Sequence, residues 1–198
     1  MKLNPRSRSP AVAHLVLVRP MMLRLLTTLF TSLLLVTAVD ANPAVQKEGW
    51  EKKIIGNVRI EIPTDCKTDV HDTPGAGAVQ RIKKFSFRTR VLDLELVFLS
   101  FPPGAGGNLD GAAANMSAQL KAVSGEESLT PWKSTTVSGR PARSMATKPD
   151  RTHQARQVTL IGDTKAKNQL IIVDISYDST SSSGKPDAER IMKSVQIR

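Results

Sequence analysis

The stretch Gln169-Leu-Ile-Ile-Val-Asp-Ile-Ser-Tyr177 decides the fold of this chain. Successive side chains of a β-strand point to opposite faces. One face of this stretch is apolar along its whole length: Ile171, Val173, Ile175 and Tyr177. The other face begins apolar with Leu170 and Ile172 and ends polar with Asp174 and Ser176. This pattern predicts a central strand that is covered on one side and partly covered on the other.

A short helix is predicted after the polar turn 178–185. Pro186 suits the first turn of a helix, where its missing N–H costs nothing. Asp187 lies where the helix dipole favours an anion, and Lys193 lies where it favours a cation. Apolar residues recur with helical spacing and form one stripe: Ala188, Ile191, Met192 and Val195. We therefore expect a helix over residues 186–193 that packs on the sheet, followed by a tail over 194–198.

Working outward from this end, the alternation of apolar and polar residues predicts further strands over 50–55, 57–62, 81–90, 91–101, 132–137, 140–148 and 154–161. A helix is predicted over 109–123, with Asn108 as its N-cap, and Ser138-Gly139 reads as a hairpin turn. Residues 64–79 and 102–108 are predicted loops, the places where we expect function. The order of elements predicts an α+β fold with a mostly antiparallel sheet.

The N-terminus has the pattern of an export signal. Basic residues precede an apolar run over 25–36, and small residues before Ala41 suit a cleavage site. We predict a cleaved signal peptide over 1–41, with translation starting at Met1 or at Met21 or Met22, a linker over 42–49 and a single domain over 50–198. A retained signal anchor is the alternative. The expected location is secreted or periplasmic.

Removal of residues 1–41 changes the charge. The full chain has 28 basic and 18 acidic residues; the part after Ala41 keeps 23 and 17, a net charge of +6. A mildly basic exported domain is not expected to bind nucleic acid, and it suits a partner protein or an anionic envelope component. We expect a monomer that meets the membrane only through its signal segment.

One group of residues could hold a metal ion. Asp65, Asp69, His71 and Asp72 lie within eight residues, together with Cys66, the only cysteine. The alternative function is a metal-dependent hydrolase that uses this stretch, although a solvated acidic loop also explains it. With a single cysteine no intrachain disulfide can form, and we expect Cys66 to be a buried thiol.

Catalytic motifs are missing from the sequence. There is no G-x-S-x-G nucleophile elbow and no H-E-x-x-H helix. The strand carboxylates Asp93, Glu95 and Asp174 could do acid–base work as a pair, but nothing in the sequence places two of them together. Basic strand 81–90 and acidic strand 91–101 favour cross-strand ion pairs instead. We predict no enzyme, no catalytic residue and no cofactor.

Three stretches resemble a known family: Asn57-Val-Arg-Ile-Glu-Ile-Pro63, Thr136-Val-Ser-Gly-Arg-Pro-Ala142, and Ile171 to Tyr177 followed by residues 188–195. Together they are similar to the PsbP-like superfamily, which includes photosystem extrinsic subunits and DcrB-like bacterial envelope proteins. The resemblance implies an α/β/α sandwich around a curved antiparallel sheet and a non-catalytic accessory or binding role. It implies no site residue.

Overall fold

The computed structural model describes residues 49–105, 108–124, 129–162 and 168–198. All of them belong to one compact unit, Ala41–Arg198. The predicted signal peptide over 1–41, its alternative starts at Met21 and Met22, and residues 42–48 of the linker lie outside the described residues. No helix in the described ranges is long and apolar enough to cross a membrane.

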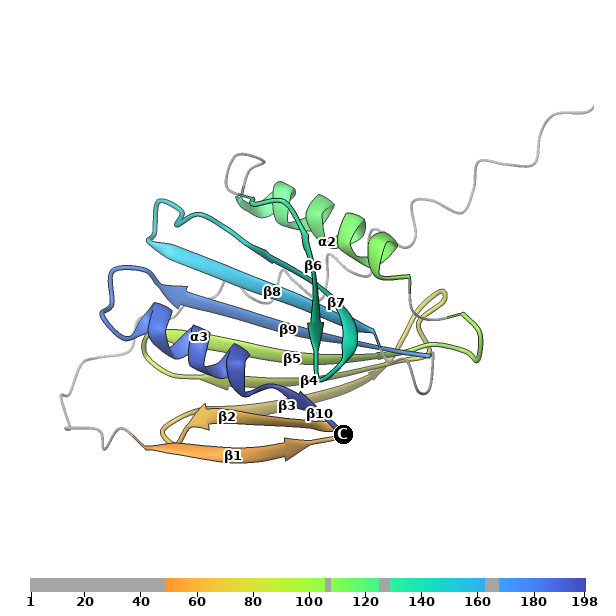
Figure 1. Cartoon of the computed structure of the whole chain (residues 1–198), viewed down its shortest axis with the longest axis horizontal. Coiled ribbons are helices and arrows are strands. Elements are labelled where there is room, and N and C mark those ends of the chain that lie inside the picture. Colours follow the sequence, from red (N-terminus) through yellow and green to blue (C-terminus); the bar gives the residue numbers. More distant parts are fainter. Residues whose placement is uncertain (1–48, 106–107, 125–128, 163–167) are drawn as a thin grey trace, which may run out of the picture. The chain divides into compact units, whose positions relative to one another are not determined.

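A seven-stranded antiparallel sheet forms the centre of the domain (Figure 1). Its strand order is β3-β4-β5-β9-β8-β7-β6. In that order the strands span Lys67–Pro74, Arg81–Arg88, Leu92–Ser100, Gln169–Asp178, Gln154–Gly162, Arg140–Ala146 and Lys133–Val137. The predicted α+β class with a mostly antiparallel sheet is confirmed.

β9 is the central strand, as its sequence predicted. It pairs with β5 on one side and with β8 on the other. Ile171, Val173 and Ile175 are fully buried on one face and form the core cluster together with residues of β2, β4 and β5. We call this side of the sheet the core face, and the side that bears Asp174 the second face.

A second, three-stranded sheet contains β1 (Trp50–Ile55), β2 (Val58–Pro63) and β10 (Gln196–Ile197) in the order β1-β2-β10. The first two strands were predicted. The expected tail over 194–198 is wrong for its last residues, because β10 pairs antiparallel with β2. The Arg198 N–H also donates to the Asn57 carbonyl at 2.9 Å. A two-residue strand has too short an alternation to be read from sequence.

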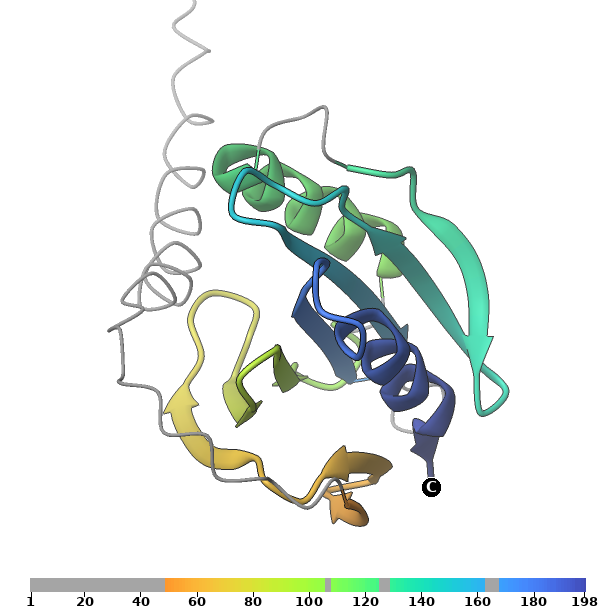
Figure 2. The same cartoon turned by 90° about the vertical axis from the view of Figure 1, so that its left-hand side faces the viewer.

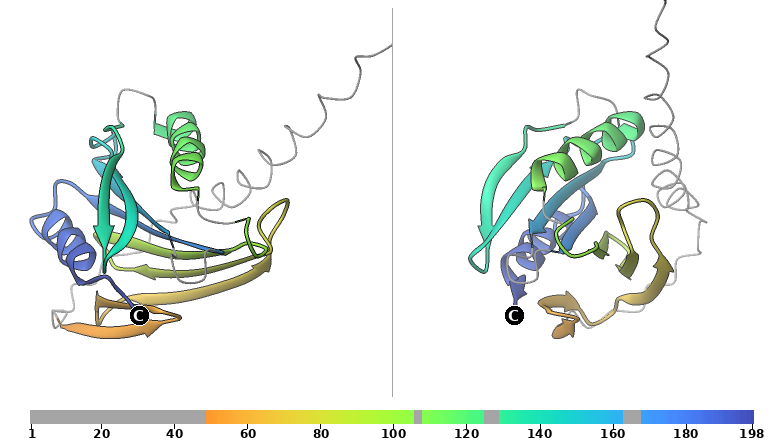
Figure 3. Two further views of the ribbon diagram at one scale, coloured as in Figure 1. Left: turned by 45° about the vertical axis from the view of Figure 1, so that its right-hand side comes forward. Right: turned by 90° about the vertical axis from the view of Figure 1, so that its right-hand side faces the viewer.

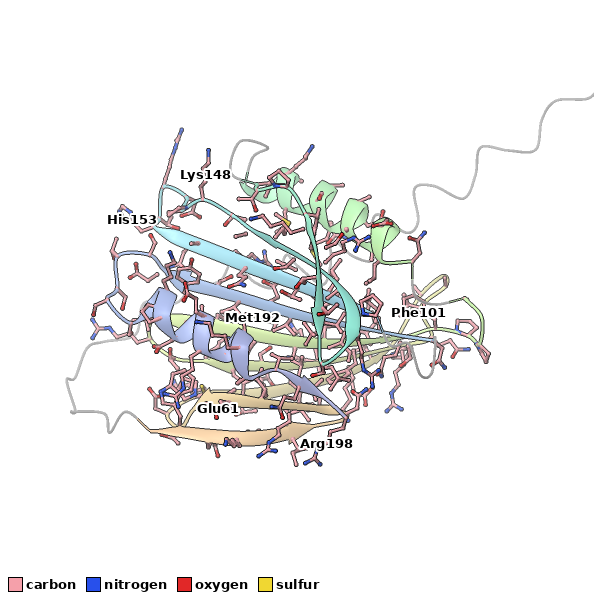
Figure 4. The ribbon with its side chains drawn as sticks, viewed as in Figure 1. Glu61, Phe101, Lys148, His153, Met192 and Arg198 are labelled. Carbon is pink, nitrogen blue, oxygen red and sulfur yellow. The ribbon has the colours of Figure 1, made fainter. Side chains whose placement is uncertain are left out.

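Helix α3 (Gly184–Ser194) contacts β9 and β5 of the large sheet and β2 of the small one. Figure 2 shows the helix, in dark blue, beside β9. The predicted stripe is confirmed, since Ala188, Ile191 and Val195 are buried and Met192 packs against the core cluster (Figure 4). The helix starts at Gly184, where an added Cβ would lie 2.4 Å from the Asp178 carbonyl oxygen. Only glycine fits this close turn.

Helix α2 (Leu109–Ser124) contacts β7 and β8. The predicted N-cap is confirmed, because Asn108 Oδ1 accepts the Gly111 N–H at 2.9 Å. Leu109 faces the backbone of Gly162, at the end of β8. A salt bridge of 2.8 Å between Arg143 of β7 and Asp110 further fixes the start of the helix.

The β6–β7 hairpin is also confirmed. Ser138 and Gly139 both have positive φ, 52° and 74°. A two-residue turn with both central residues in this region matches the twist of the strands that it joins.

The predicted loop over 64–79 is wrong for half of its length. Residues 67–74 form strand β3, which pairs with β4 from Lys67 opposite Arg88 to Pro74 opposite Arg81. All eight residues of β3 are exposed. Its sequence therefore lacks the apolar alternation of a half-buried strand, and its polar residues gave it the composition of a loop.

Candidate functional site

The predicted metal-binding residues do not converge. Asp69 and His71 share one face of β3, where His71 Nε2 and Asp69 Oδ2 lie 2.8 Å apart. Asp72 points to the other face and accepts two hydrogen bonds from Arg81, at 2.7 and 2.6 Å. Asp65 is exposed in the turn before β3. Among the described residues, no group of three or more His, Cys, Asp or Glu side chains could hold a metal ion.

Cys66 lies at the end of the same turn and is partly buried against the core cluster. Burial, together with the neighbouring Asp65 carboxylate, raises the pKa of its thiol to about 11. The thiolate, which is the nucleophilic form, is therefore scarce at neutral pH. The sequence predicted a buried thiol, and the structure shows one that is only partly buried.

The sheet brings together the three strand carboxylates that the sequence left apart. Glu95 on β5 lies directly opposite Asp174 on β9, and Asp93 lies opposite Ser176. Glu95 and Asp174 are 8% and 4% exposed. Two buried carboxylates on neighbouring strands are an arrangement that can serve acid–base chemistry, so their partners decide what they do.

Each of these carboxylates is held by a cation. Lys84 Nζ lies 3.0 Å from Glu95 Oε1, and Arg88 Nε lies 3.2 Å from Asp93 Oδ2. These two contacts confirm the ion pairs predicted between β4 and β5. Asp174 is bound through both oxygens by Arg156 of β8, with Nε at 2.6 Å from Oδ1.

Burial and pairing shift the pKa values in opposite directions. Burial raises the pKa of the Glu95 carboxyl above its ordinary value, against the pull of Lys84. It also raises the pKa of Asp93, against the pull of Arg88. Burial by itself lowers the pKa of Arg156, but the carboxylates around it, Asp174 first and then Glu95 and Asp93, together raise that pKa above its ordinary value. On the second face, each buried carboxylate is thus paired with a basic side chain of a neighbouring strand. Such a network of ion pairs is typical of a structural role.

A groove on the core face offers a different chemistry. Its volume is about 410 Å³, and it lies where the β1–β2 turn meets the ends of β4, β5 and β9. Its lining includes Asn57, Lys83, Phe85, Phe98, Ser100 and Gln169. Arg81, which holds Asp72, lies at its rim.

The apolar part of the groove is an aromatic pair. Phe85 and Phe98 meet edge to face, with ring centroids 6.0 Å apart and an interplanar angle of 82°. The Lys83 ammonium lies 5.3 Å from the Phe85 ring centroid. Phe98 is only 6% exposed and belongs to the core cluster. The ring surface open to a ligand is therefore that of the partly buried Phe85, and the cation lies beside it.

The polar part of the groove has hydrogen-bond donors without acceptors. Within the described residues, no carboxylate forms an ion pair with Lys83, and no partner takes the Ser100 hydroxyl. Gln169 uses its carbonyl oxygen to accept from the Asn57 amide at 3.3 Å, which leaves its own amide N–H groups available. Asn57 Oδ1, an acceptor, is also buried there without a hydrogen-bond partner. Free donors still predominate beside the aromatic surface, which suits an anion with an apolar body.

The groove lies at the end of the sheet where the β3–β4 turn and the segment after β5 also lie (Figure 3). Gln80 N–H donates to the Ser100 carbonyl, and Phe101 N–H to the Asn168 carbonyl, both at 2.8 Å; Phe101 is labelled in Figure 4. Sequence reasoning pointed to the loops 64–79 and 102–108, of which residues 106–107 lie outside the described residues. It missed the groove, because the lining residues come from strands far apart in the chain and share no local motif.

Comparison with known proteins gives little further information. No family model matches the chain, and no curated protein matches it. A crystal structure of a Pseudomonas aeruginosa protein of unknown function is similar at 11% identity, over 75% of this chain and 97% of that one, with a TM-score of 0.32. Neither the PsbP-like resemblance nor a function follows from this likeness.

Proposed function

We propose that the chain is an exported, non-catalytic binding domain that acts on a partner protein or an anionic envelope component. The observation that supports it best is the groove beside Phe85 and Phe98. It combines an apolar surface with uncommitted donors from Lys83, Ser100 and Gln169. This chemistry recognises a ligand that presents an anionic group next to a ring or an acyl chain.

The enzyme alternative has less support. The carboxylates that the fold brings together, Asp93, Glu95 and Asp174, each have a cation within ion-pair distance. A general base must be available to take a proton from a substrate. The metal-dependent alternative needs ligands that converge, whereas Asp69 and Asp72 point to opposite faces of β3.

We also propose the finer architecture that the resemblance implies, the α/β/α sandwich of the PsbP-like superfamily. Gly162 of β8 contacts Leu109 of α2, whereas the preceding residue, Ile161, belongs to the same core cluster as Ile191 of α3. Consecutive strand residues face opposite sides, which supports one helix layer on each face. An experimental structure that placed both helices on one face would contradict this proposal.

Binding in the groove can be tested with 8-anilinonaphthalene-1-sulfonate, an anion that carries aromatic rings and fluoresces when bound to an apolar site. We expect Lys83→Glu to weaken the affinity at least about tenfold, because it replaces attraction of the sulfonate by repulsion. Phe85→Ala should weaken it similarly by removing ring contact. The matched control is Lys133→Glu, on exposed strand β6, which should bind as the wild type does. Equal binding by all four proteins would overturn the assignment of the groove.

Export is tested separately. A fusion of residues 1–45 to a reporter should carry the reporter out of the cytoplasm, and N-terminal sequencing of the exported chain should begin at Asn42. A chain that keeps residues 1–41 would instead be a signal-anchored protein. A reporter that stays in the cytoplasm would remove the basis for an envelope role.

A further inference from the structure

The outer edge of β3 is an unpaired strand edge. β3 is the last strand of the seven-stranded sheet, and no described strand pairs with its outer side. Both of its faces are exposed along all eight residues. A long edge whose peptide groups face solvent can pair with another strand.

The backbone shows which peptide groups point outward. Gly75 N–H donates to the Gln80 carbonyl, and hydrogen-bonded pairs alternate along an antiparallel ladder. Counting from this bond, the pair Val70 and Phe85 is a non-hydrogen-bonded one. The Val70 N–H accordingly turns away from β4, and it donates to the Asp69 side chain at 2.8 Å. Thr68, Val70 and Asp72 therefore present their N–H and carbonyl groups at the outer edge.

The outer edge of β3 can pair with the same edge of a second copy, related to it by a two-fold axis at Val70. When two copies pair antiparallel with Val70 opposite Val70, Asp69 faces His71 of the other copy and Thr68 faces Asp72. The outward peptide groups of these residues then pair with one another, and the Val70 N–H exchanges its bond to the Asp69 side chain for one to the Val70 carbonyl of the other copy. The exposed Val70 side chain, 49% accessible, meets its own copy on the core face. On the second face Asp69 and His71, which lie 2.8 Å apart within each chain, come opposite His71 and Asp69 of the other copy, so each carboxylate then has an imidazole of both chains beside it.

The two neighbouring registers of this pairing place less compatible side chains opposite each other. A two-fold axis at Asp69 places two carboxylates opposite each other, and one at His71 places Val70 opposite Asp72. The residues at the two ends of β3 also limit the pairing to residues 68–72. Pro74 has no N–H to donate, and the Cys66 N–H is used by the Pro63 carbonyl at 3.4 Å.

We propose that two copies of the chain associate through their β3 edges, with Val70 on the two-fold axis, so that the two seven-stranded sheets become one continuous sheet. This dimer departs from the monomer expected from the sequence. It does not depend on the groove or on its ligand. Because a single strand pair buries little surface, we expect the association to be weak and reversible.

The first test is the mass of the purified full-length chain, 21.5 kDa as a monomer, by sedimentation equilibrium over a range of concentrations. The wild type should shift from monomer to dimer as concentration rises. Val70→Lys places like charges at the axis, and Val70→Pro removes an outward N–H that β4 does not use. Each should raise the dimer dissociation constant at least about tenfold. Ile54→Lys, at the other exposed large apolar residue, should dimerise as the wild type does.

The second test fixes the register. Asp69→Cys and His71→Cys are prepared separately in a Cys66→Ala background and then mixed under mild oxidation. The proposed pairing brings these two positions together as a non-hydrogen-bonded pair, about 4.5 Å between Cα atoms, within disulfide range. The mixture should give a disulfide-linked heterodimer, and neither protein alone should match its yield. A wild type that remains monomeric throughout, a Val70→Lys dimer as tight as the wild type, or no preference for the mixed disulfide would overturn the proposal.

Discussion

The Arg156 and Asp174 side chains form the most buried ion pair on the second face, 13% and 5% exposed. Two charges that are removed from water are stabilised mainly by each other, so the loss of one leaves the other uncompensated. Lys193 and Glu189 offer a contrast, because they meet on the surface of α3 at 3.8 Å with 81% and 48% exposure. Position in the fold, and not the type of pair, decides how much each contributes.

We therefore expect Arg156→Met to lower the free energy of unfolding by about 3 kcal/mol or more. Lys193→Met should change it by less than about 1 kcal/mol. Urea denaturation of both variants measures the difference. The double variant Arg156→Met with Asp174→Leu should recover much of the loss, since no charge is left buried alone. A double variant as unstable as the single one would show that Arg156 acts through something other than this pair.

At the same scale, sequence predicted only those pairs whose strands are joined by a short turn. These ion pairs follow from the β4–β5 hairpin, because a tight connection fixes the register. Arg88 lies opposite Asp93, and Lys84, opposite Val97, reaches diagonally to Glu95. Glu95 opposite Asp174 does not follow, because a helix and three strands separate β5 from β9 in the chain. No local pattern encodes that register.

At the scale of elements, one side chain, that of Asn108, caps the start of α2. Asn108 Oδ1 takes the Gly111 N–H, which the helix itself cannot satisfy. Asn108→Ala should lower the free energy of unfolding by about 1 kcal/mol and speed hydrogen exchange of the Gly111 amide. Asn108→Ser keeps an acceptor and should retain most of the stability. If alanine and serine behaved alike, the cap would not stabilise the helix.

Elements with a strong local signal were predicted well. The helix stripe of α3, the Asn108 cap and the Ser138-Gly139 turn all rest on interactions within a few residues. β3 was missed because its strand conformation comes from pairing with β4 and not from its own composition. The groove was missed for a related reason, since three separate strands must meet before Phe85, Ser100 and Gln169 become neighbours.

At the scale of the whole molecule, burial of the second face links stability to pH. Burial raises the pKa of Glu95 above its ordinary 4.5. The folded protein therefore binds this proton more tightly than the unfolded chain does. Between 4.5 and the raised value, the free energy of unfolding contributed by Glu95 falls as pH rises.

Glu95→Gln removes this titration. We expect the free energy of unfolding of the wild type, measured relative to that of Glu95→Gln, to decrease as pH is raised from about 4.5 through the raised pKa of Glu95. Chemical denaturation at a series of pH values gives the difference directly. The other carboxyl groups, Asp93 among them, are present in both proteins and largely cancel. A difference that grew with pH would mean that Lys84 outweighs burial and lowers this pKa.

The place of β9 in the chain has a consequence for synthesis on the ribosome. Without Gln169–Asp178, the large sheet is two unconnected pieces, β3-β4-β5 and β8-β7-β6. Both pieces emerge from the ribosome before the strand that joins them, so the nascent chain holds two apolar edges, β5 and β8, open until β9 follows. Such edges pair readily with other chains. A message truncated just before codon 169 should therefore yield an aggregating product and not a smaller folded domain.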